Sequence, residues 1–274
     1  MNISIVIPVS SDLRIANCVK SIDENVELVI SLNNPTEELR NLAQDIAKNP
    51  KKFCAKELDV KVCQIDYLSI AGAYNNGIKH SSNDLILLMD SDCTFSPGCI
   101  KKLYHNLDSN KLSKGKVNFL FTNSLSKLIS RAREFHTSDF INAYSPPLLF
   151  NKNILRDIGG YYFHPKLCWM EDGEFDYRIR ETKLNISYDS TAIVHHCALT
   201  LLKDLRNAFW YGVGRRISFD LRLVEKPSGF IKSINNYFLK GCQSKGFFVG
   251  FYLLLWKYIQ LIGYYSQGVF NIRK

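Results

Sequence analysis

The chain has 274 residues, of which 46% are hydrophobic and 22% charged, a composition typical of a globular protein with a sizeable core. Its net charge of +9 favours an anionic partner such as a phosphorylated small molecule or a membrane surface, but the scattered basic residues match no nucleic-acid recognition motif. The eight cysteines form no C-x-x-C pair, so we expect free thiols in a cytoplasmic protein, with neither a disulfide framework nor a structural zinc site.

The first 122 residues alternate between β-branched apolar runs and segments of helical spacing. We expect strands at 3–9, 27–32, 60–65, 85–89 and 117–122, and helices at 13–22, 36–48, 70–80 and from Pro97. The first run meets Pro8 almost at once, which favours a strand over a signal peptide. Strands that alternate with helices predict an α/β fold with a mainly parallel sheet flanked by helices.

The pattern is less regular from residue 123 onward. We expect strands at 145–150, 186–188 and 192–195, helices at 152–158 and 171–182, and a break at Gly159 and Gly160. Beyond residue 200 the sequence is helical and rich in aromatic residues, and no linker sequence separates it from the rest. The sequence therefore predicts one compact domain with a C-terminal helical extension.

Two carboxylates one residue apart follow the apolar strand at 85–89. Asp90-Ser91-Asp92 would lie at the carboxyl edge of the sheet, where open α/β folds bind ligands. The two acidic groups repel each other unless a cation or hydrogen-bond donors lie between them, and carboxylate oxygens suit Mg²⁺ or Mn²⁺. The alternative is a polar strand exit in which Asp92 caps the next turn.

Four features occur in a fixed order along the chain. They are the strand at 3–9, AGAYNNGI at 71–78 ahead of Asp90-Ser91-Asp92, GGY at 159–161 ahead of WMED at 169–172, and VHH at 194–196 ahead of WYGVGR at 210–215. This ordered set resembles the family 2 glycosyltransferases of the GT-A fold, which carry a D-x-D motif and, later, an E-D motif.

The resemblance covers about residues 1–215. It implies a GT-A, Rossmann-like domain with a nucleotide-binding half at 1–122 and an acceptor and catalytic half at 123–215, followed by the helical extension at 216–274.

The resemblance also implies a metal site for Mn²⁺ or Mg²⁺. Asp92 would contact the ion directly, while Asp90 would lie nearer the ribose or reach the ion through water. His195, at the end of a later strand, could complete the coordination as a neutral imidazole, or could instead bond to a backbone carbonyl. His196 is the alternative ligand, because neighbouring strand residues face opposite sides and only one of the two can serve.

Asp172 is the predicted catalytic base. It would take the proton from the acceptor hydroxyl as that oxygen attacks the anomeric carbon opposite the leaving diphosphate, which inverts the configuration. At a helix start, the dipole and backbone N–H groups are expected to lower the pKa of Asp172. Glu171 is the alternative base or an orienting partner, and the structural alternative is that Asp172 only caps the helix.

The resemblance also implies a further set of residues that bind the nucleotide-sugar. They are Pro8, Val9, Asn33, Asn75, Asp90, Ser91 and Arg215. Asn33 stands where the family commonly has an aspartate, and Tyr74 where it often has an arginine, so we expect Tyr74 to pack. Arg215 suits the oxygens of the diphosphate, with an ordinary basic helix face as the alternative.

The C-terminal stretch at 247–265 is apolar except for Lys257 and Gln260. Its uninterrupted part, 247–256, is too short to span a bilayer, but its tyrosines and the basic segment at 226–245 suit a helix lying on an anionic membrane. A helix buried against the domain and an oligomer contact are the alternatives.

Together these observations predict an inverting, metal-dependent glycosyltransferase that acts in polysaccharide or glycolipid synthesis. The acceptor would be a saccharide or lipid-linked saccharide, and the enzyme would be cytoplasmic, at the inner face of the membrane. One alternative is a sugar-phosphate nucleotidyltransferase, although residues 8–12 do not form the glycine-rich phosphate loop of that class. The other is a non-catalytic carbohydrate-binding scaffold on a degenerate transferase fold.

Overall fold

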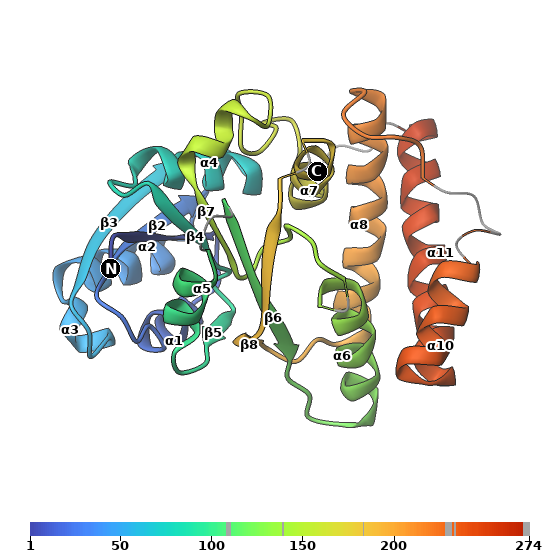
Figure 1. Cartoon of the computed structure of the whole chain (residues 1–274), viewed down its shortest axis with the longest axis horizontal. Coiled ribbons are helices and arrows are strands. Elements are labelled where there is room, and N and C mark those ends of the chain that lie inside the picture. The colour runs from blue at the N-terminus through green and yellow to red at the C-terminus, as the bar shows by residue number, and fades with distance from the viewer. Residues whose placement is uncertain (108–110, 139, 183, 228–231, 233, 271–274) are drawn as a thin grey trace.

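Helices surround one mixed sheet in the computed structural model of the chain (Figure 1). The structure describes residues 1–107, 111–138, 140–182, 184–227, 232 and 234–270. Residues 228–231, 233 and 271–274 of the predicted extension, which include part of the basic segment, lie outside the described residues.

The eight described strands lie in the order β3-β2-β1-β4-β7-β6-β8-β5. Their bounds are β1 Ile3–Val9, β2 Val26–Asn33, β3 Leu58–Ile65, β4 Leu85–Leu88, β5 Cys93–Phe95, β6 Leu112–Phe119, β7 Leu148–Asn151 and β8 Ile186–His196. The pairings among β1 to β4 are all parallel, as predicted. The second half is mixed, because β7 runs antiparallel to both β4 and β6, β5 runs antiparallel to β8, and β6 and β8 are parallel.

The strands of the first half are buried on both faces. Ile3, Ile5 and Ile7 of β1 point into one apolar cluster, and Val6 points into the other on the opposite face. This is the alternation of a central strand in a parallel sheet. A strand buried on both faces needs apolar side chains at every position, so the strands near the N-terminus appear in the sequence as continuous apolar runs.

The helices agree with the predictions in the first half and depart from them later. Their bounds are α1 Ile15–Lys20, α2 Glu37–Lys48, α3 Pro50–Phe53, α4 Ile70–His80, α5 Cys99–Leu107, α6 Ser124–Thr137, a 3-10 turn at Lys152–Arg156, α7 Glu171–Glu181, α8 Leu201–Asp220, a π-helical segment at Ile234–Leu239, α10 Lys240–Lys245 and α11 Phe247–Phe270. Thr36 caps α2, because its side chain accepts a hydrogen bond from the backbone N–H of Leu39. Pro97 lies in the turn before α5 and does not start the helix.

From residue 112 onward the structure departs from the predictions at three places. Helix α6 was not anticipated, although Asn123 and Ser126 form a capping box at its start. The strand expected at 117–122 begins earlier, at Leu112. The two short strands expected at 186–188 and 192–195 are one strand, β8, because a bulge opposite Gly115 and Lys116 keeps it paired with β6.

The predicted C-terminal extension packs against the rest of the fold. Helix α11 lies alongside α8 (Figure 1), and the residue 215/216 boundary falls inside α8. A Cβ on Gly212 of α8 would lie 1.9 Å from the Gln260 carbonyl oxygen, and one on Gly263 of α11 would lie 2.0 Å from that of Phe209. The two backbones therefore touch, so α11 is packed directly against α8.

Candidate active site

The Asp90-Ser91-Asp92 turn connects β4 to β5 at the carboxyl edge of the parallel strands, as predicted. The Asp90 carboxylate accepts a 2.9 Å hydrogen bond from the Tyr74 hydroxyl. Tyr74 also stacks on Phe163, so it packs as expected and in addition holds Asp90. Burial, and next the charge of Asp92, raise the pKa of Asp90 to about 7. A cation bound near this turn would favour the ionised form of Asp90.

Asp92 is surrounded by basic side chains. Its Oδ2 lies 3.3 Å from Arg14 Nη2, 3.4 Å from His196 Nε2 and 3.9 Å from Lys203 Nζ. Arg14 and Lys203 were not singled out in the sequence, because Arg14 lies in a turn and Lys203 in the first turn of a helix, with no motif around either. Arg14 also pairs with the Asp12 carboxylate, so Lys203 is the cation here without a closer acidic partner among the described residues.

His196 rather than His195 is next to Asp92. In β8, His196 pairs with Cys93 and presents Nε2 toward Asp92, whereas Nε2 of His195 lies 2.9 Å from the Ser96 hydroxyl. The prediction that His195 faces the D-x-D turn is therefore corrected to His196, the alternative that the strand alternation left open.

A divalent cation fits the donor atoms of Asp92 and His196. One ligand atom each from Asp92, Cys93 and His196 lies within 4.8 Å of the others. Burial lowers the pKa of His196, which favours the neutral imidazole that a metal requires, and burial raises the pKa of the Cys93 thiol well above its usual value. A protonated thiol is a poor ligand, so the oxygen of Asp92 and the nitrogen of His196 are the donors suited to Mn²⁺ or Mg²⁺.

Asp172 lies at the second position of α7. Met170, in a left-handed conformation with φ of 66°, occupies the N-cap position, so Asp172 does not cap the helix. Its carboxylate accepts a 2.7 Å hydrogen bond from the Gly173 backbone N–H. Burial nevertheless raises the pKa of Asp172 to about 6, which overturns the expected lowering, because desolvation outweighs the backbone N–H.

Glu171 precedes Asp172 and shares its burial. Burial and then the charge of Asp172 raise the pKa of Glu171 well above its ordinary value. The two carboxyls therefore titrate as a coupled pair, in which each charge raises the cost of the other. A pKa of about 6 leaves Asp172 able to serve as a base near neutral pH.

Lys114 is a residue of the site that the sequence analysis missed. It is fully buried in β6, and its Nζ donates to the carbonyl oxygens of Tyr144 at 2.6 Å and Pro146 at 2.7 Å. Burial lowers its pKa to about 7, against the opposing charges of Asp172 and Asp90. If the predicted strand had begun at residue 112, as β6 does, Lys114 would have been expected at an inward-facing position of that strand.

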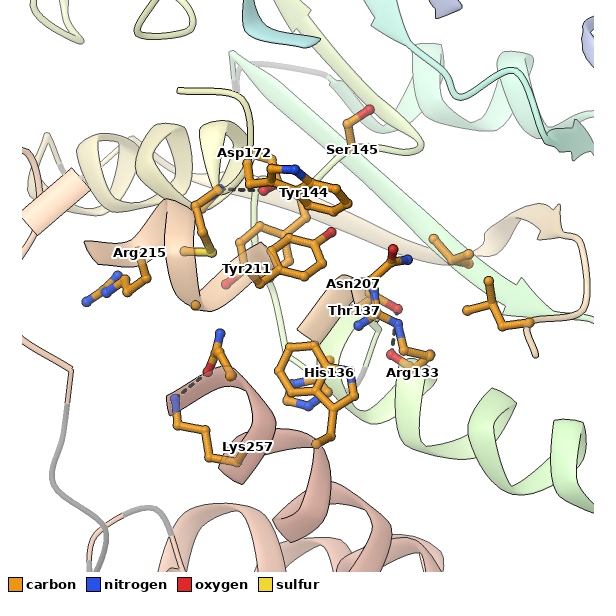
Figure 2. Close-up of a pocket in the computed structure, with 18 of the residues that line it drawn as sticks. Arg133, His136, Thr137, Tyr144, Ser145, Asp172, Asn207, Tyr211, Arg215 and Lys257 are labelled. Carbon is orange, nitrogen blue, oxygen red and sulfur yellow. Dashed lines mark hydrogen bonds between the residues drawn. The ribbon is translucent and has the colours of Figure 1, made fainter. Parts of the chain in front are cut away.

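Two cavities meet at the carboxylates. The larger has a volume of about 540 Å³ and the smaller about 260 Å³. Both are lined by Asp90, Ser145, Trp169, Asp172 and Tyr211. The smaller cavity reaches Asn33, Ser69, Tyr74 and Glu171, on the side of the first strands. The larger one reaches α8 and α11, where it is lined by Arg215 and Lys257 (Figure 2).

The remaining predicted nucleotide residues lie around these cavities to different degrees. The Asn33 side chain, which lines the smaller cavity, accepts from the Ser69 backbone N–H at 2.8 Å. The amide of Asn75 bonds to the backbone N–H and carbonyl of Phe163 and so ties α4 to that segment. Pro8 and Val9 are buried at the end of β1, and Ser91 is half-buried in the turn.

Comparisons with known proteins agree with this geometry. The family model described as "Glycosyl transferase family 2" matches residues 4–172. No curated protein matches the sequence. Among solved structures, Staphylococcus aureus TarS 1-349 has a TM-score of 0.53 at 14% identity, covering 100% of this chain and 75% of that one.

Two other solved structures contain a bound nucleotide-sugar. TarS 1-349 in complex with UDP-GlcNAc has a TM-score of 0.53 at 15% identity, covering 98% of this chain and 92% of that one. The mannosyltransferase PcManGT from Pyrobaculum calidifontis, in complex with GDP-Man and Mn²⁺, has a TM-score of 0.61 at 10% identity, covering 99% of this chain and 76% of that one. At these identities the likeness concerns the fold, which is GT-A-like.

The raised pKa of Asp90 predicts a pH-dependent gain in stability on neutralisation. Because the pKa rises from 3.8 in the unfolded chain to about 7 in the folded one, ionisation of Asp90 costs the folded state free energy as the pH rises through that window. Asp90→Asn, which keeps an oxygen for Tyr74, should raise the free energy of unfolding at pH 8 by more than about 1 kcal/mol, and less at pH 5. Urea unfolding at both pH values measures this. Asp59→Asn, at an exposed position of β3, is the control, and an equal gain at both pH values would contradict the explanation.

Proposed function

The chain belongs to glycosyl transferase family 2 and is a glycosyltransferase. We propose that it transfers a sugar, with inversion, from a nucleoside-diphosphate sugar to an acceptor hydroxyl. The observation that carries the proposal is one cavity lined by Asp90, Asp92 and His196 as well as by Asp172. It combines groups for a metal and a diphosphate with a buried carboxylate suited to act as a base. A base next to the groups for the metal and the diphosphate favours a transferase over the sugar-phosphate nucleotidyltransferase and the non-catalytic scaffold.

Asp172 is the proposed base. With a pKa of about 6 it is mostly ionised at neutral pH, yet it binds a proton more readily than an ordinary aspartate. It accepts the proton of the acceptor hydroxyl as that oxygen forms its bond to the anomeric carbon. The bond from that carbon to the diphosphate oxygen breaks, and the electron pair leaves with the diphosphate. Attack opposite the leaving group inverts the configuration.

The leaving diphosphate needs positive charge. Lys203, beside Asp92, supplies a cation, and it lies in the first turn of α8, where backbone N–H groups favour anions. Arg14, paired with Asp12, is the second cation beside Asp92. Asp92 and His196 would hold a Mn²⁺ or Mg²⁺ ion, which when bound compensates the charge of the phosphates as a Lewis acid. The PcManGT structure, in complex with GDP-Man and Mn²⁺, supports this by analogy of fold.

The nucleoside is assigned to the smaller cavity. Asn33, Ser69 and Tyr74 line it, and the segment bearing Asp90 joins it to the larger cavity. Asn33 offers an amide in place of a carboxylate, and amides can both donate to and accept from a base or ribose. The sugar would then lie between the two cavities, next to Asp172.

We further propose that the outer face of α11 lies on an anionic membrane, at the cytoplasmic side, which suits a lipid-linked acceptor and a role in polysaccharide or glycolipid synthesis. Among the described residues, α11 is the one helix long and apolar enough to cross a membrane. Its inner face is buried in the protein, with Tyr252 and Leu253 in the core. Its outer face exposes one stripe of large apolar side chains, at Phe248, Phe251, Leu255, Tyr258, Ile262, Tyr265 and Val269.

The composition of this stripe favours a membrane surface over water. Phe248 is 77% and Tyr265 58% exposed, and the spacing of three and four residues keeps the stripe on one side of the helix. Lys240, on α10 just before α11, is exposed, and the chain carries a net charge of +9. Aromatic side chains next to cations are typical of interfacial helices on anionic lipid.

The function is tested by separating donor binding from transfer. Asp172→Asn should bind UDP- and GDP-sugars within about threefold of the native affinity but lose at least about a thousandfold in transfer, because it cannot take the acceptor proton. In the native enzyme kcat/KM should fall tenfold per pH unit below about pH 6. Glu171→Gln, which mimics a protonated Glu171, should lose less than tenfold. The reverse ranking of the two variants would make Glu171 the base, and failure of every nucleotide-sugar to bind would sink the transferase proposal.

The metal ligand is tested by a matched pair of neighbours. Thermal-shift titration with UDP- and GDP-sugars should show added stabilisation by Mn²⁺, because Asp92 and His196 would hold the ion and its charge would favour the bound phosphates. His196→Ala should remove the Mn²⁺-dependent part and His195→Ala should keep it, since only His196 lies next to Asp92. Loss in His195→Ala with retention in His196→Ala would overturn the assignment.

Membrane contact is tested on the surface of α11, because deletion of the helix would also remove a wall of the cavity. The triple variant of Phe248, Phe251 and Tyr258 to Ser should release the protein from vesicles of phosphatidylglycerol and phosphatidylcholine in a flotation assay, through loss of apolar contact. The matched control replaces Leu13, Tyr104 and Leu125 by Ser, which are exposed elsewhere. Equal flotation of the two triple variants would refute the contact.

A further inference from the structure

Two cations on the α8 and α11 wall of the larger cavity have no acidic partner. Lys257 is 8% exposed, and its Nζ donates to Gln260 Oε1 at 2.6 Å. Arg215 is half-buried, and its Nη2 donates to the backbone carbonyl of Glu225 at 2.8 Å. Within the described part of the chain, no carboxylate lies within ion-pair distance of either cation, although both line the cavity.

Another cation in the same cavity is neutralised. Arg133 Nε lies 3.6 Å from the Asp204 carboxylate, which also accepts a 2.6 Å hydrogen bond from Tyr252. Figure 2 shows Arg133 on one side of the cavity and Arg215 with Lys257 on the other. Burial and then the charge of Arg215 lower the pKa of Lys257 to about 8, so the pair costs free energy in the ligand-free protein. Buried charges are ordinarily paired, which makes this exception informative.

The other polar atoms on this wall point to the same kind of ligand. The indole Nε1–H of Trp256 and the hydroxyl of Tyr264 are buried, line the cavity and have no hydrogen-bond partner among the described residues. The oxygen of Gln260 is already bound by Lys257. Lys257, Arg215 and the Trp256 indole can only donate, whereas the Tyr264 hydroxyl can donate or accept, and an ionised phosphate or carboxylate only accepts. Three donor-only groups, two of them cations, are complementary to an oxyanion.

The wall is also held in position. At Gly212 and Gly263 the backbones of α8 and α11 approach so closely that a Cβ would clash with the Gln260 or the Phe209 carbonyl. The two helices that bear the four donors are therefore in contact before any ligand binds, which lowers the entropy cost of recognition.

We propose that Arg215, Lys257, Trp256 and Tyr264 form an oxyanion subsite for the acceptor, so that the acceptor carries a phosphate or carboxylate in addition to the hydroxyl that attacks. This rests on the proposed function. The donor diphosphate has its own cation, Lys203, at Asp92, and beside it Arg14, which is paired with Asp12. Lys257 and Arg215 lie close enough for the charge of Arg215 to lower the pKa of Lys257, and the described hydrogen bonds of the two side chains go to Gln260 and Glu225, not to the D-x-D turn. We therefore assign Arg215 to the oxyanion of the acceptor instead of the donor diphosphate.

The test measures binding of small charged sugars by titration calorimetry, with the enzyme saturated by Mn²⁺ and UDP or GDP. Glucose 6-phosphate or glucuronate should bind at least tenfold tighter than glucose, and the stronger of the two tells whether phosphate or carboxylate is the group recognised. Lys257→Met and Arg215→Gln should each abolish the preference, whereas Lys257→Arg should restore most of it. Arg206→Gln, an exposed arginine of the same helix, is the charge-matched control and should keep it. Thermal unfolding of each variant establishes that it is folded.

Two results would overturn the subsite. One is equal affinity for the charged and the neutral sugars in the native enzyme. The other is a loss of UDP or GDP affinity in Lys257→Met as large as that in Lys203→Gln, which would assign the pair to the donor. Nucleotide binding is measured first, so a failure of the transferase proposal is recognised separately: without nucleotide binding the acceptor assignment falls, whatever the affinity for glucose 6-phosphate.

Discussion

The burial of three carboxylates at one edge of the sheet is the constraint on which the rest of the site depends. Asp90, Glu171 and Asp172 come from two segments far apart in the sequence, and each has its pKa raised by desolvation. Such groups are tolerated only where cations or protons compensate them. Lys114 below the carboxylates, and the cations around Asp92, supply part of that compensation. Burial raises the pKa of Glu171 and of Asp172, so the coupled pair holds protons more strongly than ordinary carboxyls do.

The first half of the fold could be predicted because its determinants are local. Strands buried on both faces read as continuous apolar runs, and Thr36 with two glutamates marks the start of α2. The same locality placed Asp90 and Asp92 correctly at the end of β4. The antiparallel pairing of β7, the three-residue strand β5 and helix α6 depend on partners distant in sequence, which no local period encodes.

Within the site, the sequence predicted which residue types gather but not which way they face. The choice between His195 and His196 depends on the register of β8 against β5, which strand alternation alone leaves open. The sign of the pKa shift at Asp172 depends on how deeply α7 is buried, and the helix start by itself predicted the opposite direction. Lys114 was missed because its strand begins five residues before the predicted one.

The close packing of α8 and α11 changes what the C-terminal helix does. A segment expected to be an appendage supplies Lys257 to the cavity that is also lined by Asp90 and Asp172. Asp172 is ionised above about pH 6, and Lys257 keeps its proton below about pH 8. An oxyanion bound at Lys257 would raise its pKa, because an opposite charge favours the protonated form. Acceptor binding would therefore widen the pH range in which the base and the cation are both charged, and would couple recognition of the acceptor to the ionisation state that transfer requires.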